Sequence, residues 1–250
     1  MLLADKNAVI YGAAGFIGSG VARAFAREGA RVFLAGRTRA KLERLAEELR
    51  ATGGAVDVAE VDALDERAVG EHADAIAAEA GSLDISFNLI THPHTFGTPL
   101  TEMAVDDFMA PIETAARTTF LTAQAAARHM TRQGSGVILI FGGSGDVPRG
   151  FYAGGTVVAF EAMETMRRQL SAELGRHGVR VVTITTNGIA ESFPEDARSD
   201  AVERLAAETL LGRAATVEDA GEAAVYAASD RARCVTAATI NISGGALVDR

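Results

Sequence analysis

The chain has 250 residues and a formal net charge of −9 at pH 7, and 48% of its residues are hydrophobic. This length and composition suit one large α/β domain with a buried core, and the negative charge disfavours nonspecific binding to nucleic acid or to an anionic membrane. The lone Cys234 excludes an internal disulfide, no Cys/His cluster has zinc spacing, and no apolar run reaches the roughly 20 residues of a membrane span, so we expect a cytoplasmic protein without a metal site.

Apolar strand-like runs alternate with amphipathic helical stretches along the whole chain. Strands are predicted at residues 8–11, 31–35, 56–61, 85–90, 137–141, 179–185 and 239–242. Helices are predicted at residues 18–28, 39–51, 66–80, 105–131 (one helix or two), 156–175, 199–211 and 217–229. Continuous Val/Ile runs are typical of strands buried on both faces, and regular βα alternation predicts a parallel sheet with helices on both sides. Because no internal repeat or Pro/Gly-rich linker interrupts the pattern, residues 1–250 are predicted to form a single α/β domain.

A glycine-rich segment joins the first predicted strand to the first predicted helix. In such a segment one glycine permits a tight turn, a second lets the backbone approach a pyrophosphate, and a third lets the helix lie close to the strand. The helix N-terminus also offers free N–H groups and a partial positive charge to phosphate oxygens. The predicted dinucleotide-binding residues here are Gly12, Ala14, Gly15, Phe16, Ile17 and Gly18. The alternative is a purely structural turn, which the position between strand and helix disfavours.

The end of the second predicted strand favours NADP(H) over NAD(H). An NAD-selective site usually has an acidic residue there to bind the adenine ribose hydroxyls, whereas this chain has Gly36 followed by Arg37. Arg37, with Arg39 nearby, is suited to a bidentate contact with a 2′-phosphate. A solvated arginine at a strand end is the alternative interpretation.

Taken together with later motifs, these residues make the chain similar to the short-chain dehydrogenase/reductase family. The motif Asn88-Leu89-Ile90-Thr91 stands where that family has Asn-Asn-Ala-Gly, and the tail from Gly212 to Gly245 looks like its C-terminal pattern. The glycine spacing departs slightly, since family members of this length usually have the middle glycine at the position of Phe16. The resemblance implies a Rossmann-type doubly wound parallel sheet of about seven strands, a small-molecule substrate, and a homotetramer or homodimer. It also implies cofactor contacts by Asp62, Ala63, Asn88, Ile90, Gly188 and Ile189.

The resemblance breaks down at the catalytic positions. Members of the family use an Asn, a Ser, a Tyr and a Lys, and the flanking sequence aligns these four positions with Ala115, Gly143, Thr156 and Phe160. The chain has no lysine after Lys41 that might take over the role. A threonine hydroxyl is far too weak an acid to replace a phenol, and a phenylalanine ring carries no charge that would lower a neighbour's pKa.

Other side chains near the same predicted crevice are candidates for proton transfer. His92 and His94 follow the fourth predicted strand, where ligands sit in open α/β sheets, and histidine titrates near neutral pH. Ser144, on the loop after the fifth strand, is a candidate for polarising a carbonyl, and Tyr152 precedes the next helix. The alternatives are plain loop histidines, an ordinary turn serine and a tyrosine that packs against a lid. That lid is predicted at about residues 189–213, with Phe193, Pro194, Leu205, Leu210 and Leu211 as its apolar residues.

Three functions are consistent with the sequence. The first is an NADP(H)-dependent oxidoreductase that reduces a small organic substrate with a non-standard proton donor. The second is a non-redox enzyme on the same scaffold, such as an isomerase, dehydratase or cyclase. The third is a catalytically silent homologue with a binding or assembly role. The retained glycine loop and Arg37 favour the first, because assembly does not require a phosphate cradle.

Overall fold

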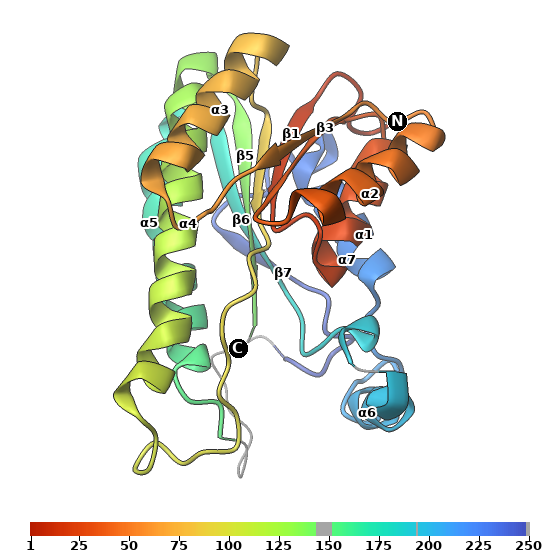
Figure 1. The fold of residues 1–250 in the computed structure, drawn as a ribbon, viewed down its shortest axis with the longest axis vertical. Coiled ribbons are helices and arrows are strands. Elements are labelled where there is room, and N and C mark those ends of the chain that lie inside the picture. The colour runs from red at the N-terminus through yellow and green to blue at the C-terminus, as the bar shows by residue number, and fades with distance from the viewer. Residues whose placement is uncertain (144–151, 194, 249–250) are drawn as a thin grey trace.

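Buried apolar runs of four to seven residues form the strands of one parallel sheet in the computed structural model, which describes residues 1–143, 152–193 and 195–248 (Figure 1). The strands are β1 (Asn7–Tyr11), β2 (Arg31–Gly36), β3 (Val56–Glu60), β4 (Ile85–Asn88), β5 (Gly136–Gly142), β6 (Val179–Thr185) and β7 (Ala238–Asn241). They lie in the order β3-β2-β1-β4-β5-β6-β7, and every neighbouring pair is parallel. This arrangement confirms the predicted doubly wound sheet.

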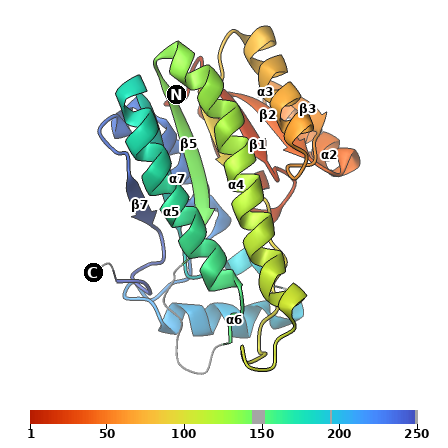
Figure 2. The same ribbon diagram turned by 90° about the vertical axis from the view of Figure 1, so that its left-hand side faces the viewer.

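Helices cover both faces of the sheet. One face carries α1 (Phe16–Arg27), α2 (Arg39–Ala51) and α7 (Val217–Ala228), and the other carries α3 (Glu66–Ala80), α4 (Val105–Gln133) and α5 (Thr156–Leu174). Figure 2 shows α3, α4 and α5 side by side on their face. The remaining helix, α6 (Glu195–Ala207), lies below the sheet, and short 3-10 turns occur at Gly175–His177, Ala190–Ser192 and Asp230–Ala232.

Each helical layer encloses its own apolar core against the sheet. Phe25 of α1 and Leu34 of β2 are fully buried in the core beneath α1, α2 and α7. Ile76 of α3 and Met130 of α4 are buried in the core beneath α3, α4 and α5. Burying side chains of this size stabilises the fold by about 1.5–3 kcal/mol each, and both faces of the strands therefore need apolar residues.

Strand β4 ends two residues earlier than the apolar pattern predicts. The side-chain oxygen Oδ1 of Asn88 accepts the backbone N–H of Ile90 at 3.1 Å, which turns the chain out of the sheet. Leu89 and Ile90 therefore belong to the loop that leads into the crevice. The apolar pattern cannot mark this end because the residues beyond it are apolar too.

Two helices also differ from their predicted bounds. The stretch predicted as one helix or two is the single helix α4, which accommodates Pro111 in its interior. Helix α6 begins at Glu195 and ends at Ala207, about four residues before the predicted 199–211. Glu195 and Asp196 in its first turn suit the positive end of the helix dipole, which explains the earlier start. Leu210 and Leu211 consequently lie after the helix and are exposed.

Among the described residues, none of the helices combines the length and the apolar character that crossing a bilayer requires.

A capping box fixes the start of α7. The hydroxyl of Thr216 accepts the backbone N–H of Asp219 at 3.2 Å, and the Asp219 carboxylate accepts the backbone N–H of Thr216 at 2.9 Å. Arg213 also donates to this carboxylate at 2.7 Å. The bond from Arg213, followed by those from Thr216, lowers the pKa of Asp219 to about 2.

Replacing Asp219 with Asn should lower the free energy of unfolding at pH 7 by about 1–2 kcal/mol, because the charged cap and its ion pair are lost and the pair is partly screened by solvent. A carboxylate whose folded-state pKa lies below its unfolded value of about 3.9 stabilises the fold above that value and loses the effect as the pH falls. Urea unfolding should therefore give the same difference in the free energy of unfolding between the wild type and Asp219→Asn at pH 7 and at pH 5. The difference should be smaller at pH 3. Glu218→Gln, an exposed residue of the same turn, is the matched control; an equal loss in that variant would contradict the assignment.

Candidate active site

The crevice at the carboxyl ends of β1 and β4 is the place where the strand order reverses, since β1 lies between β2 and β4. Open α/β sheets bind their ligands at such a switch point. The backbone of Gly12 has φ +79°, and a Cβ atom there would lie 2.5 Å from the carbonyl oxygen of Leu89. Only glycine lets the loop after β1 run this close to the end of β4.

The first turn of α1 fits the phosphates of a dinucleotide. Its N-cap is Gly15, no side chain caps the N-terminus, and the first turn contains no acidic residue. A Cβ atom at Gly18 would overlap the carbonyl oxygen of Gly12, so the absence of a side chain there lets the helix start directly against the glycine turn. The resulting cradle of free N–H groups, with Ala14, Phe16 and Ile17 around it, suits an anion.

Arg37 and Asp62 lie on the side of the crevice formed by β2 and β3. Arg37 is exposed immediately after β2 and forms no ion pair with any residue that the structure describes. Arg39, by contrast, is paired with Glu43 at 3.0 Å. Asp62 is exposed and accepts the backbone N–H of Leu64 at 3.0 Å, while the neighbouring Ala63 is buried. Of the two arginines that the sequence indicates, Arg37 is therefore the one whose charge is not already neutralised by a carboxylate.

Asn88 ties the end of β4 to α4. Its Nδ2 donates to the hydroxyls of Thr118 at 3.1 Å and Thr119 at 3.2 Å, while its Oδ1 holds the N–H of Ile90. The side chain is buried, so these bonds are strong and costly to lose. Asn88 thereby fixes the backbone at Ile90, which lies beside the glycine turn.

The residues after β6 also contact the glycine loop. Ile189 is buried in a small apolar cluster that includes Ile17 of α1 and Ala215. The N–H of Gly188 donates to the hydroxyl of Thr186 at 3.2 Å, which sets the course of the chain as it leaves the strand. The structure thus brings the predicted cofactor residues of the N-terminal and C-terminal halves together.

Four aromatic rings form a row beside the crevice. Phe96 stacks on His94 with 5.2 Å between ring centroids, His94 and His92 meet edge to face at 5.9 Å, and His92 meets Phe160 edge to face at 6.3 Å. These separations lie within the range of favourable aromatic contacts. We call Phe96, His94, His92 and Phe160 the aromatic row.

Helix α5 supplies two contacts to the aromatic row. The Nδ1 atom of His94 lies 3.1 Å from the hydroxyl oxygen of the buried Thr156. One turn later, the ring of Phe160 lies over Gly143, where a Cβ atom would overlap it. A serine at position 143 is therefore incompatible with this position of the Phe160 ring. The buried Ala115 of α4 contributes no polar group.

Both histidines are neutral at pH 7. Burial, and secondarily the neighbouring His94, lowers the pKa of His92 to about 4. Burial also lowers the pKa of His94 from its ordinary value. Neutral imidazoles can donate or accept hydrogen bonds in the crevice, and they contribute no fixed positive charge to it.

The remaining predicted catalytic residues are less constrained. Ser144 lies outside the described residues. Tyr152 is 49% exposed, and its backbone carbonyl accepts the N–H of Gly97 at 2.9 Å. That bond joins the start of α5 to the loop after β4, but the phenol itself makes no hydrogen bond within the described part of the chain.

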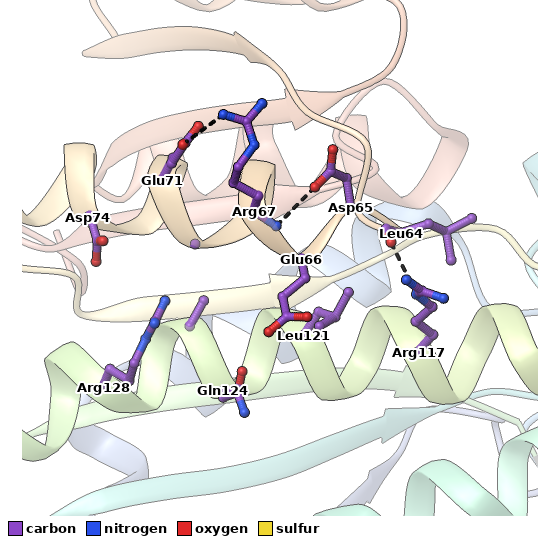
Figure 3. A pocket seen from close by; sticks show the side chains of 12 residues that line it. Leu64, Asp65, Glu66, Arg67, Glu71, Asp74, Arg117, Leu121, Gln124 and Arg128 are labelled. Atoms are coloured by element: carbon purple, nitrogen blue, oxygen red, sulfur yellow. Dashed lines mark hydrogen bonds and ion pairs between the residues drawn. The ribbon is translucent and has the colours of Figure 1, made fainter.

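A separate groove of about 750 Å³ lies between α3 and α4 (Figure 3). It is lined by charged side chains such as Arg67, which is paired with Glu71 at 3.1 Å, and Arg117, which donates to the carbonyl of Leu64. The side chains of Arg67 and Glu71 are 79% and 64% exposed. Such pairs are well solvated, and we interpret the groove as a wet helix surface. Among the described residues, no three His, Cys, Asp or Glu side chains are close enough together to hold a metal ion.

Sequence patterns gave no indication of two of these features. The bond between His94 and Thr156 links residues 62 positions apart, and the contact between Gly143 and Phe160 joins a strand end to a helix. Both depend on how α5 is seated against the sheet. A small residue at 143 together with a large one at 160 is the only signal in the sequence, and it becomes meaningful once the two positions are known to touch.

Gly143→Ala should lower the free energy of unfolding by about 1–2 kcal/mol, since the new methyl group must displace the Phe160 ring. In a chain that also carries Phe160→Leu, which vacates part of that space, Gly143→Ala should lower the free energy of unfolding by less than it does in the wild-type chain. Thermal and urea unfolding of the double-mutant cycle measures this coupling. Gly175→Ala, at a helical position with open space around it, is the control and should not destabilise the protein. Additive effects at positions 143 and 160 would show that the two residues do not touch.

Comparison with known proteins gives a consistent picture. A family model described as enoyl-(acyl carrier protein) reductase matches residues 12–246. L-rhamnose 1-dehydrogenase (NAD(P)(+)) of Azotobacter vinelandii is 32% identical, with an alignment covering 100% of this chain and 99% of the relative. D-threitol dehydrogenase of Mycolicibacterium smegmatis is 31% identical, covering 97% of this chain and 93% of the relative.

Solved structures agree with the sequence relatives. A short-chain type dehydrogenase/reductase from Mycobacterium marinum superimposes with a TM-score of 0.85 at 26% identity, covering 99% of this chain and 97% of that one. The family match, the identity to curated relatives and the sheet order all point the same way, and the chain belongs to the short-chain dehydrogenase/reductase family.

Proposed function

We propose that the protein is an NADP(H)-dependent oxidoreductase that reduces a small organic substrate without the Tyr-Lys pair on which its family usually relies. The observation that carries this proposal is the uncapped first turn of α1 against the Gly12 turn, with Arg37, which no described carboxylate pairs, at the same end of the sheet. When bound, the dinucleotide supplies the hydride; the protein binds it, orients the substrate and manages the proton.

The preference for NADP(H) rests on Arg37. Gly36 leaves no carboxylate at the end of β2, and the Arg37 guanidinium is available for a bidentate contact with a 2′-phosphate. Thr38, the N-cap of α2, makes no side-chain capping bond, so its hydroxyl and the N-terminus of α2 are also available to an anion. The relative from Azotobacter, by its name, uses either dinucleotide. That is compatible with a preference set by a few side chains.

The proposal that the family's usual acid is missing rests on the side chains at the four aligned catalytic positions. Thr156, Phe160, Gly143 and Ala115 occupy the positions that resemble the family's Tyr, Lys, Ser and Asn, and the chain contains no lysine beyond Lys41. The contact between Phe160 and Gly143 supports this alignment, since each residue suits the absence of the usual side chain at the other position. His92, Ser144 and Tyr152 remain our candidates from the sequence for the replacement chemistry.

We also propose that the protein forms a homotetramer or homodimer. The exposed apolar residues Phe120 on α4 and Val158 on α5 support a subunit contact across these two helices.

Arg37→Ala should reduce the affinity for NADPH about 10- to 100-fold and leave that for NADH nearly unchanged, because the lost charge-assisted bonds go to the 2′-phosphate alone. Titration of each dinucleotide against the purified protein, followed by nicotinamide fluorescence, gives the two affinities. Arg44→Ala, an exposed arginine further along α2, is the matched control. An unchanged ratio of affinities in Arg37→Ala would refute the assignment. Failure of the wild-type protein to bind either dinucleotide would instead favour a non-redox or assembly role.

Simple ketones should be poor substrates. Without a phenolic acid, the carbonyl oxygen receives less assistance, and acid catalysis is worth roughly 100- to 10,000-fold. We therefore expect NADPH oxidation to be at least about 100-fold slower with cyclohexanone than with the activated carbonyl 4-nitrobenzaldehyde. Comparable rapid turnover of both compounds would show that a strong acid is present and that Thr156 and Phe160 have been wrongly aligned with the Tyr-Lys pair.

A further inference from the structure

We infer that His94, held in place by Thr156, is the residue that exchanges the proton with the substrate oxygen. This inference rests on the proposed function and deepens it, because it identifies the replacement for the missing acid. It starts from a chemical requirement: reduction of a carbonyl group by hydride leaves a negative oxygen that must be protonated. Among the described side chains around the crevice, His92, His94 and Tyr152 carry protons that a side chain can exchange in water.

Two independent contacts fix the ring of His94. Its Nδ1 atom lies 3.1 Å from the hydroxyl oxygen of Thr156, and one face of the ring stacks on Phe96 at an interplanar angle of 13°. A stack restricts the plane of the ring, and a hydrogen bond to one edge restricts its rotation within that plane. A proton-transfer group needs this kind of fixed orientation.

Thr156 is itself held rigidly. It is 3% exposed and is the first residue of α5, directly after the N-cap Gly155. A side chain at Gly155 would overlap the carbonyl oxygen of Phe108, so the start of α5 sits directly against α4. The hydroxyl that orients His94 therefore belongs to a tightly packed helix start rather than to a loose loop.

The hydrogen bond at Nδ1 leaves Nε2 for the substrate. Nε2 of His94 has no partner among the residues that the structure describes, and the ring lies on the exposed part of the loop that follows β4. With Nδ1–H donating to Thr156, the neutral ring presents the Nε2 lone pair to the crevice, and the protonated ring presents Nε2–H. The other hydrogen-bonding edge is thus the one available to a ligand.

The other two candidates are less well placed. His92 is enclosed edge to face by His94 and Phe160 and makes no hydrogen bond within the described chain, so burial keeps it neutral with a pKa of about 4. Tyr152 has a phenol without a described partner. Of the groups in the described part of the chain that are packed against His94, His92 is the one that titrates; Thr156 and Phe96 are uncharged. We therefore assign His92 a packing role beside the crevice, and we assign the proton transfer to His94.

The proton-transfer step balances as follows in the reducing direction. The bound dinucleotide would supply the hydride with its electron pair to the carbonyl carbon, and the π electron pair of the C=O bond would move onto oxygen. Nε2 of the mainly neutral His94 first takes up a proton from the solvent, which makes the imidazolium a minor form at pH 7. The Nε2–H bond of this imidazolium then breaks, its electron pair stays on Nε2, and the proton bonds to the substrate oxygen. The neutral ring keeps its Nδ1–H on Thr156 and regains a proton from water. In alcohol oxidation the same Nε2 accepts the hydroxyl proton.

Kinetics with 4-nitrobenzaldehyde and NADPH test the chemical role. His94→Phe retains the stack on Phe96 and removes both nitrogens, and it should lower kcat about 100-fold. Thr156→Val should lower kcat about 10-fold with little change in KM, and Thr156→Ser should restore most of the loss. His177→Phe is the control, because His177 lies just before β6, at the amino ends of the strands and opposite the crevice, and its turnover should match the wild type.

Nitrogen-15 NMR of the histidine rings in the cofactor-free protein tests the geometry independently of turnover. Neutral His94 should carry its proton on Nδ1 in the wild type and in Thr156→Ser, and should become a mixture of tautomers in Thr156→Val. Unchanged kcat in His94→Phe, or an Nε2–H tautomer in the wild type, would overturn this inference and leave the proposed function standing. A wild-type protein that transfers no hydride to the aldehyde would overturn both.

Discussion

The close approach of the Gly12 turn to the end of β4 is the contact on which the rest of the site depends. A side chain at position 12 would meet the carbonyl of Leu89, so the loop after β1 would have to move away from the crevice. The start of α1 would move with it, because Gly18 lies directly on the Gly12 carbonyl. The uncapped start of α1 and the polar loop after β4 share one crevice because two positions lack a Cβ atom.

The chemistry of the crevice differs from its scaffold. The scaffold contains the glycine turn, the uncapped start of α1 and the Asn88 anchor of β4. The side on which substrate would lie contains neutral imidazoles, a phenylalanine ring and a threonine. In the function that we propose, such a site would assist proton transfer by orientation more than by strong acidity, and it would suit substrates whose carbonyl carbon is already electron-poor.

Local patterns were sufficient for the parts of the structure that depend on neighbours in sequence. The β1 glycine turn and the alternation of strands and helices follow from runs of a few residues, and the structure matches both. The bounds of α6 were missed because its weakly amphipathic sequence gives little indication of register, while its acidic first turn decides where it begins. The end of β4 was missed because a side-chain turn at Asn88, and not a change in hydrophobicity, terminates the strand.

The contacts within the site join residues that are far apart in the sequence, so the sequence alone could not predict them. His92 and His94 can be recognised in the sequence as loop histidines. However, Thr156, which orients His94, lies on α5, and Phe160, whose ring confines His92, follows one turn later. No spacing rule connects these residues. The pairing of Gly143 with Phe160 is a matter of volume, since one position carries a large ring where the other has no side chain.

The chain segment that follows β6 leaves and returns at almost the same point. Ile189 and Ala215 form a parallel bridge, and the N–H of Ala190 donates to the carbonyl of Ala215 at 2.9 Å. The segment between Ile189 and Ala215 is therefore a loop whose two ends are hydrogen-bonded to each other. Because the entropy of closing a loop rises only slowly with its length, such a loop can be lengthened, shortened or exchanged with little effect on the sheet. The bridge between Ile189 and Ala215 therefore allows the segment between them to vary while the sheet stays the same.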